Sequence, residues 1–294
     1  MTVAVQAASP YAQRKRRAEE LAQRWPFATE VLRFYLALLD GQRSAFTQAQ
    51  AAALDPRDAA AFAAEHVLPG VVEASVTHGP PALQQGVLER FDAIDIERTI
   101  GAWLYGEPLD GFDRFLARAA TAPVLEALGE RAGEACAGAR GERTCPVCGG
   151  LPQLAYIAVT NEDLVTPHRY LACSRCASSW AFTRMTCAAC GEFESANLLH
   201  FSELGSLEAE ASGRTVRGAD PDAAPNHDVI AAEKPRLPHV SIDGCRTCSH
   251  YLLSVDASRD PSAVPVVDEL AALPLYVYAG ERGLAKIVAN QLGF

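Results

Sequence analysis

The chain carries nine cysteines, and their spacing is the strongest chemical signal in its 294 residues. Eight of them form four pairs with two intervening residues: Cys145/Cys148, Cys173/Cys176, Cys187/Cys190 and Cys245/Cys248. Two residues between cysteines let a tight turn direct both sulfurs at one point about 2.3 Å away, as tetrahedral thiolate coordination requires. Two such turns supply four thiolates, so the four pairs predict two complete metal sites.

Metal binding is favoured over disulfide or thiol-exchange chemistry. One Cys-x-x-Cys pair is typical of thioredoxin-like redox sites, but four of them outside any βαβ pattern are not. The odd number of cysteines also argues against a disulfide framework. Four thiolates suit either Zn²⁺, which would act as a structural clamp, or iron, which would also allow one-electron redox chemistry. The ninth cysteine, Cys136, is expected to be a helix-end or buried residue without a role.

The lengths of chain between the pairs indicate which pairs share an ion. Between Cys148 and Cys173 lie 24 residues, enough for a hairpin, and 54 residues lie between Cys190 and Cys245. The order of turn, strand, connection, strand, turn and strand thus occurs twice, as an internal repeat. We therefore expect two tandem rubredoxin-like or zinc-ribbon modules. In the alternative, the two middle pairs share an ion, and the outer pairs close a loop of about a hundred residues at a greater entropic cost.

Helices are expected on both sides of these modules. Before residue 140 alanine is abundant and apolar residues recur at spacings of three and four, with Asp95 and either Asp110 or Asp113 as candidate helix starts. The predicted fold class is α+β. Its parts are an N-terminal all-α helical domain (1–140), a first metal module (141–184), a second metal module (185–260) and a C-terminal helical segment (261–294).

Two segments of the second half have a distinct composition. Residues 210–238 are rich in Gly, Pro, Asp and Ala without periodicity, which predicts a long surface loop. Residues 267–273 and 276–292 are expected to be helical. We expect these last helices to pack back onto the helical domain or to cover the β region.

The acidic balance of the chain limits the classes of partner. The net charge is −10 and the pI is about 5.2. Residues 145–294 carry 11 Lys and Arg against 17 Asp and Glu, and each loaded four-thiolate site would add about −2. These charges argue against proteins that bind nucleic acid or anionic lipid through phosphate groups.

The sequence also predicts a cytoplasmic protein without membrane insertion. No apolar run approaches the roughly 18–20 residues that span a bilayer. The basic cluster near the N-terminus follows a weakly apolar stretch instead of preceding it, which is atypical of a signal peptide.

The remaining polar residues indicate no catalytic constellation, and we expect a protein that is not an enzyme. Phosphate-binding loops, HExxH and GxSxG are absent from the sequence. The basic run 14–17 predicts a solvated helix face, with docking of an acidic partner as the alternative. The acidic pairs Glu162/Asp163 and Asp268/Glu269 predict turn or helix-start charges. His168 and His250 are expected at the surface or just outside the thiolate sites.

Four stretches together resemble the FdhE family of formate dehydrogenase accessory proteins: TCPVCGGLP, RYLACSRCASSWAFTRMTCAACGE, GCRTCSHYLLSVD and VPVVDELAALPLYVYAGERG. The resemblance covers the C-terminal half in order, whereas the N-terminal half carries no specific motif. It implies a cytoplasmic, non-catalytic maturation factor. Such a factor binds the catalytic subunit of a molybdenum- or tungsten-dependent formate dehydrogenase before export by the twin-arginine pathway.

The resemblance also implies the nature of the metal sites. They would be rubredoxin-like and associated with iron, with the eight paired cysteines as ligands. Ala177 departs from the family pattern, which more often has Gly at this position. The turn after Cys176 is therefore expected to be less favourable, although no ligand is lost.

Two functions from other classes are compatible with the same residues. A rubredoxin-like iron redox protein would pass electrons through two iron–thiolate centres. A zinc-ribbon protein would bind nucleic acid, with a steep dependence of its affinity on salt.

Overall fold

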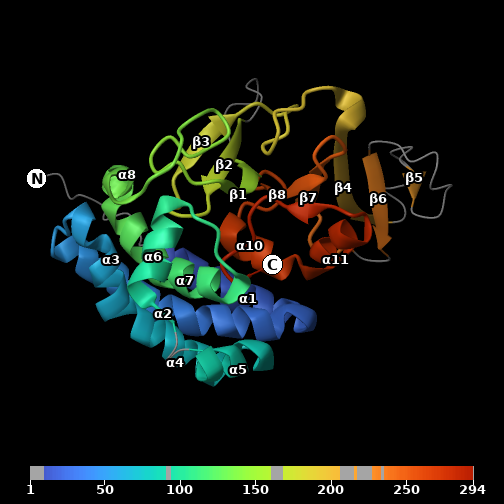
Figure 1. Ribbon diagram of the computed structural model, residues 1–294. Helices are drawn as coiled ribbons and strands as arrows, with labels where there is room; N and C mark the ends of the chain where they lie inside the picture. Colours follow the sequence, from blue (N-terminus) through green and yellow to red (C-terminus); the bar gives the residue numbers. More distant parts are fainter. Residues whose placement is uncertain are drawn as a thin grey trace, which may run out of the picture.

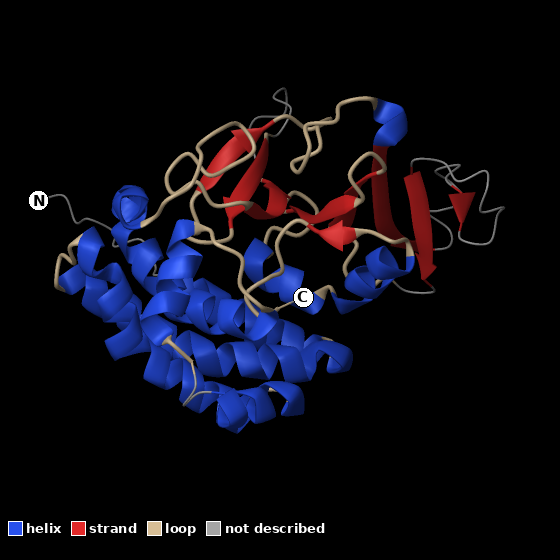
Figure 2. Cartoon of the chain, viewed as in Figure 1, coloured by secondary structure: helices blue, strands red, loops and turns tan. Residues whose placement is uncertain are grey.

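The structure has a layer of helices on one side and a mixed β-sheet on the other (Figure 1), and the two layers separate clearly by type of secondary structure (Figure 2). This computed structural model describes residues 10–90, 94–159, 168–205, 215–216, 227–232 and 235–293. The predicted α+β class is confirmed. The acidic pair at 162 and 163 lies outside the described residues.

The helical layer is formed by the first part of the chain. Its helices are α1 (Pro10–Arg24), α2 (Thr29–Ala51), α3 (Ala59–Phe62), α4 (Leu68–His78), α5 (Pro81–Arg90), α6 (Ile96–Tyr105), α7 (Gly111–Leu128) and α8 (Ala132–Ala135), with a π-helical turn at Ala63–Val67. Asp95 and Asp110 start α6 and α7 as expected, because each side chain accepts a hydrogen bond from a backbone N–H three residues later, at 3.0 and 2.9 Å. Gly106, at φ 75°, ends α6.

The strands of both predicted metal modules belong to one sheet. They are β1 (Pro152–Ile157), β2 (Arg169–Cys173), β3 (Ser179–Phe182), β4 (Leu198–Gly205), β5 (Thr215–Val216), β6 (His227–Ala232), β7 (Val240–Cys245), β8 (His250–Asp256) and β9 (Ala285–Lys286). Their order is β3-β2-β1-β8-β7-β4-β6-β5, with β9 beside β8. The modules join where β1 runs parallel to β8, with Leu154 opposite Leu253. The boundaries at residues 140, 184 and 260 remain predictions.

The C-terminal segment lies between the two layers. Helices α10 (Pro265–Ala271) and α11 (Leu273–Glu281) lie beneath the sheet, and α10 contacts α1 and α2 on its other side (Figure 1). Val267 and Leu270 are fully buried in a core shared with the inward side chains of β7 and β8 and with residues of α1 and α2. Burial of this apolar surface on both sides of α10 holds the layers together.

Two expectations for the second half differ from the structure. The segment 210–238, expected to be a loop, contains β5 and β6, which extend the sheet beside β4; residues 210–214, 217–226 and 233–234 lie outside the described part. Strand pairing requires only backbone hydrogen bonds, so composition gives little sign of these two strands. The helix expected over 276–292 ends at Glu281, because Gly283 adopts φ 70° and residues 285–286 pair with β8.

The basic run 14–17 is solvated only in part, because Arg16 is exposed whereas Arg17 is only 2% exposed. Its guanidinium donates to Asp268, with Nη2–Oδ1 at 2.5 Å, and to Asp260, with Nη2–Oδ2 at 2.6 Å. Asp268 also accepts from His239 Nε2 at 2.8 Å and from the backbone N–H of Val264, which starts α10. The ion pair therefore fastens α1 to α10 across about 250 residues of sequence.

The pair Asp268/Glu269 was expected to carry turn or helix-start charges, and Asp268 does lie in the first turn of α10; its burial was not foreseen. Both carboxylates are fully buried, and Glu269 accepts from Lys286 and Gln153. A buried carboxylate is stable only when paired and hydrogen-bonded. The two partners of Glu269 lie in β9 and β1, so the sequence around Glu269 could not indicate them.

Replacement of Arg17 tests the role of this ion pair. Arg17→Met leaves the carboxylate of Asp268 buried without its cation, so we expect the free energy of unfolding to fall by about 3–5 kcal/mol. Urea denaturation of the full chain measures the change.

A matched control lies two residues earlier on the same helix. Lys15 pairs with Asp40 at 3.0 Å, and their side chains are 40% and 56% exposed. Lys15→Met should therefore cost less than about 1 kcal/mol. Equal losses for the two variants would contradict the structural role assigned to Arg17.

Candidate metal centres

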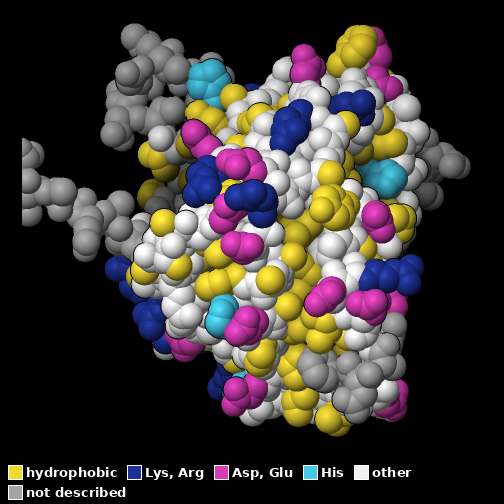
Figure 3. Space-filling model, turned by 60° about the vertical axis from the view of Figure 1, so that its left-hand side comes forward, with side chains coloured by type: hydrophobic (Ala, Val, Ile, Leu, Met, Phe, Trp, Pro, Cys, Tyr) yellow, Lys and Arg dark blue, Asp and Glu magenta, His cyan; other side chains and the backbone are white. Residues whose placement is uncertain are grey.

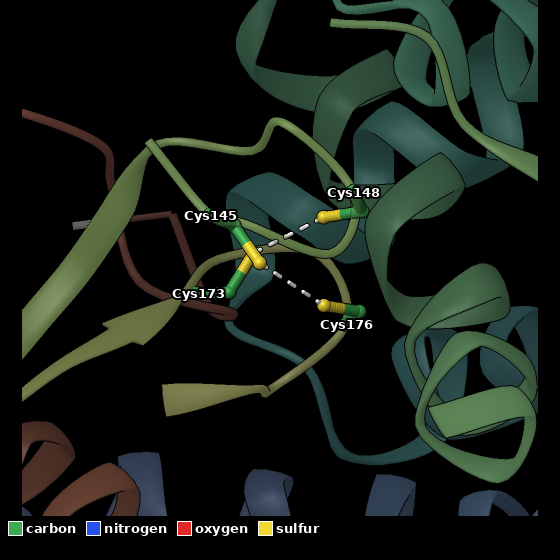
Figure 4. A group of neighbouring side chains, drawn as sticks. All are labelled: Cys145, Cys148, Cys173 and Cys176. Atoms are coloured by element: carbon green, nitrogen blue, oxygen red, sulfur yellow. Dashed lines mark hydrogen bonds between the residues drawn. The ribbon is translucent and has the colours of Figure 1, made fainter. Parts of the chain in front are cut away.

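Four cysteines from the first module converge on one point, here called site 1: Cys145, Cys148, Cys173 and Cys176 (Figure 4). The sulfur atoms of Cys145 and Cys176 are 3.7 Å apart, and those of Cys148 and Cys173 are 3.4 Å apart. Metal–sulfur bonds of about 2.3 Å in a tetrahedron place sulfurs about 3.8 Å apart. The thiols of site 1 are thus spaced as a tetrahedral ion requires.

The other two pairs form a second group of the same kind, here called site 2. Sulfur–sulfur distances are 3.8 Å between Cys187 and Cys248 and 3.7 Å between Cys190 and Cys245. Consecutive pairs along the chain therefore meet in space, and the alternative pairing of the two middle pairs is wrong. Both donor sets fit a divalent zinc or iron ion.

All four Cys-x-x-Cys turns share one backbone conformation. The residue after the second cysteine has a positive φ in each turn: 71° at Gly149, 58° at Ala177, 85° at Gly191 and 55° at Ser249. In three turns the N–H of this residue donates to the carbonyl oxygen of the first cysteine at 2.9 Å. Ala177 thus adopts the conformation that glycine favours, and Ser249 is a second departure that the sequence analysis missed. Each costs roughly 1–2 kcal/mol of local strain.

Glycines also let site 1 approach its surroundings closely. A Cβ added at Gly149 would lie 2.8 Å from the backbone of Gly138, in the segment that follows α8. A Cβ at Gly150 would lie 2.8 Å from the sulfur of Cys173. By contrast, a Cβ at Gly191 in site 2 would meet only the side chain of Arg143, at 3.8 Å. The helical segment therefore packs directly against the first metal turn.

The two sites differ in burial. The four thiols of site 1 are at most 4% exposed and form part of the hydrophobic core around α7. In site 2, Cys190 is exposed and Cys248 is partly exposed. Site 1 is thus internal, whereas site 2 lies at the surface.

The thiols of site 1 cannot ionise independently. Hydrogen bonds from Cys148, Cys173 and Cys176 hold the pKa of Cys145 far below its usual range. Hydrogen bonds with Cys136 and Cys145 raise the pKa of Cys148 to about 11. One thiolate is thus stabilised by neighbouring neutral thiols, and an ion that binds all four must displace the remaining protons.

Other candidate residues have clear positions. Cys136 is buried at the end of α8, as expected, but it also lies beside site 1, where a hydrogen bond with Cys148 lowers its pKa. His250 Nδ1 lies 2.6 Å from the carbonyl oxygen of Cys248, just outside site 2. His168 is exposed at the start of β2.

A third group of potential ligands comprises His239, Asp260 and Asp268. The guanidinium of Arg17 donates to both of these carboxylates, so the group already has its cation. Their spacing gave no sign of this group, because positions 239, 260 and 268 match no ligand motif.

Comparisons with known proteins agree with this arrangement. A family model described as the FdhE central domain matches residues 144–184, which contain site 1. A protein FdhE homolog from Aquifex aeolicus (strain VF5) is 26% identical over 223 residues, covering 74% of this chain and 65% of the relative. One from Haemophilus influenzae (strain PittEE) is 28% identical over 151 residues, covering 51% and 38%. The matches thus span less than two thirds of these relatives' lengths.

The fold is also similar to a solved structure. The crystal structure of the FdhE protein from Pseudomonas aeruginosa matches with a TM-score of 0.54 and 20% identity, covering 96% of this chain and 95% of that chain. At this identity the match shows the fold alone. The resemblance to the FdhE family is confirmed. No helix in the described part of the chain combines the length and apolar composition needed to cross a membrane.

The contrast between the metal turns predicts different costs for equivalent substitutions. Gly149→Ala and Gly191→Ala each place a Cβ on a residue with positive φ, which should lower the free energy of unfolding by roughly 1–2 kcal/mol. Gly149→Ala also forces contact with Gly138, which adds about 1–3 kcal/mol. Thermal unfolding of the zinc-loaded proteins measures the loss of stability in each variant. Equal losses in the two variants would contradict the close approach at site 1.

The contrast in burial predicts different rates of metal loss. A chromogenic chelator should remove zinc in two phases, with site 2 at least about tenfold faster because solvent reaches it. Cys187→Ser/Cys190→Ser should abolish the fast phase, and Cys145→Ser/Cys148→Ser the slow phase. The reverse assignment would refute the link between burial and retention.

Proposed function

We propose that this chain, whose resemblance to the FdhE family the comparisons confirm, is a non-catalytic accessory protein for the maturation of formate dehydrogenase. It binds the catalytic subunit in the cytoplasm, before twin-arginine export. The observation that carries the proposal is the match of the FdhE central domain to residues 144–184, where four thiols converge at tetrahedral spacing. The surrounding fold, which resembles that of an FdhE protein along nearly the whole chain, supports the same assignment.

We further propose that each site holds one metal ion through its four cysteines: Cys145, Cys148, Cys173 and Cys176 at site 1, and Cys187, Cys190, Cys245 and Cys248 at site 2. The family resemblance favours iron, and the donor sets suit zinc equally. The bound ions supply rigidity: each fixes two turns that small β modules could not hold through apolar burial alone.

The surface supports a protein as the client. Figure 3 shows hydrophobic side chains in a strip down one face, bordered by acidic and basic groups. At site 2, Met185 and Phe193 flank the turn at Cys187–Cys190 and are 54% and 68% exposed. Large exposed apolar side chains on a rigid turn are typical of protein interfaces. We place the contact with the catalytic subunit at this end of the sheet.

One alternative has a structural observation in its favour. The exposure of Cys190 would let an iron ion at site 2 exchange electrons with a partner. A visible charge-transfer spectrum that bleaches with dithionite and recovers reversibly would support such a redox protein, whereas colourless protein with two zinc ions would exclude it. Binding of nucleic acid with a steep salt dependence would instead support the zinc-ribbon alternative.

The proposed contact predicts a specific loss of client binding. Phe193→Ser/Met185→Ser should reduce co-purification of the formate dehydrogenase catalytic subunit at least about tenfold, the loss of roughly 1.4 kcal/mol or more of binding free energy. Quantitative pull-down of the catalytic subunit measures the effect, with metal content checked in each sample.

Leu88→Ser provides the matched control. Leu88 is 71% exposed on α5, in the helical layer away from the sheet (Figure 1). The variant should retain the client at the level of the unmodified chain. If the unmodified chain does not retain the subunit while other cellular proteins bind, the accessory function is wrong. If Leu88→Ser and Phe193→Ser/Met185→Ser lose the client equally, the position of the contact is wrong.

A further inference from the structure

Site 1 places a net negative charge inside the protein. Four thiolates around a divalent ion leave a charge of about −2. The four sulfur-bearing side chains are at most 4% exposed and lie among apolar residues of the helical core. A buried charge is costly unless a counter-charge lies close to it. The loaded site therefore requires cations from its surroundings.

Arg175 is the first cation beside site 1. It lies in the turn between Cys173 and Cys176, and its backbone N–H donates to the sulfur of Cys173 at 3.3 Å. Its guanidinium donates to the carbonyl oxygen of Ala137 at 3.0 Å and lies 5.7 Å from the centre of the Trp103 ring. All these guanidinium partners are uncharged.

Arg118 is the second cation, and it comes from the helical layer. It lies on α7, is 4% exposed, and has its guanidinium 5.9 Å from the centre of the same Trp103 ring. Its hydrogen-bond acceptors, the backbone oxygen of Ala289 and the side-chain oxygen of Gln153, are neutral. Arg118 and Cys173 both line one cavity of about 50 Å³.

The other charges near Arg118 do not balance it. The negative charge of Glu269 attracts the guanidinium of Arg118, but this carboxylate already pairs with Lys286. Arg14 and Glu126 line the same cavity and form an ion pair at 2.6 Å, so they cancel one another. Arg118 thus carries a buried positive charge for which the described residues supply no carboxylate of its own.

We propose that Arg118 and Arg175 are the counter-charges of metal-loaded site 1. Their two positive charges match the two negative charges of a divalent tetrathiolate, so together they form a nearly neutral group. Because Arg118 belongs to α7 and Arg175 to the first metal module, this group couples loading of site 1 to the docking of the helical layer. Site 2 needs no such partners, since its exposed Cys190 and partly exposed Cys248 let water screen the charge of that site.

The proposal rests on metal binding at site 1, and the reduction potential of iron at that site tests it. The full chain carrying Cys190→Ser/Cys248→Ser is loaded with iron, so that only site 1 contributes. Removal of a nearby positive charge destabilises the reduced form, which is the more negative one. Arg118→Met should therefore shift the equilibrium between oxidised and reduced iron about tenfold toward the oxidised form, which is about 59 mV for a one-electron couple.

Three further variants separate charge from structure. Arg118→Lys keeps the charge and should restore most of the potential. Arg114→Met removes a partly exposed cation one turn earlier on α7 and should change the potential much less. If Arg118→Met fails to fold, Arg118→Gln replaces it, because its amide can still donate hydrogen bonds. A competing chelator should also show about tenfold weaker zinc affinity at site 1 for the uncharged variants.

The possible failures are distinguishable. Equal potentials for Arg118→Lys and the uncharged variants, or an equal shift in Arg114→Met, would overturn the counter-charge role while leaving the metal site intact. Failure of the background protein to bind iron or zinc at all would overturn metal binding at site 1, and with it this proposal.

Discussion

The convergence of four buried thiols between the helical layer and the sheet is the constraint on which the rest of the structure depends. Cys145 and Cys148 come from the turn before β1, Cys173 ends β2 and Cys176 lies in the turn that follows, so one ion would close this hairpin. The same thiols belong to the core around α7. Structural zinc contributes about 10–16 kcal/mol in small peptides, which exceeds what so short a hairpin gains from apolar burial.

The chain joins its parts by a different interaction at each contact. Parallel pairing of β1 with β8 merges the two modules into one sheet. Helix α10 fills the space between that sheet and α1, where Arg17 and Asp268 form a buried ion pair. Site 1 and its neighbouring arginines hold the other end of the helical layer. Site 2 lies outside all these contacts, which leaves its surface available for a partner.

Features set by a few consecutive residues were predicted correctly. Features that depend on contacts between residues far apart in the sequence were not. The spacing of the cysteines predicted the two four-thiol groups, because a Cys-x-x-Cys turn is set by four consecutive residues. Asp95 and Asp110 indicated helix starts for the same reason. Arg17 was predicted to be solvated, and the burial of Asp268 and Glu269 was not predicted. The burial of Arg17 and Asp268 depends on their pairing with one another across about 250 residues of sequence, which neither local stretch could indicate.

The sequence by itself determined the class of fold, the eight candidate ligands, their grouping and the resemblance to the FdhE family, because each is written in short stretches of residues. Only the tertiary structure decided that the modules share a sheet, that one site is internal and the other exposed, and that Arg118 and Cys173 line one cavity. Burial and charge compensation are sums over neighbours in space, and those neighbours come from separate parts of the chain.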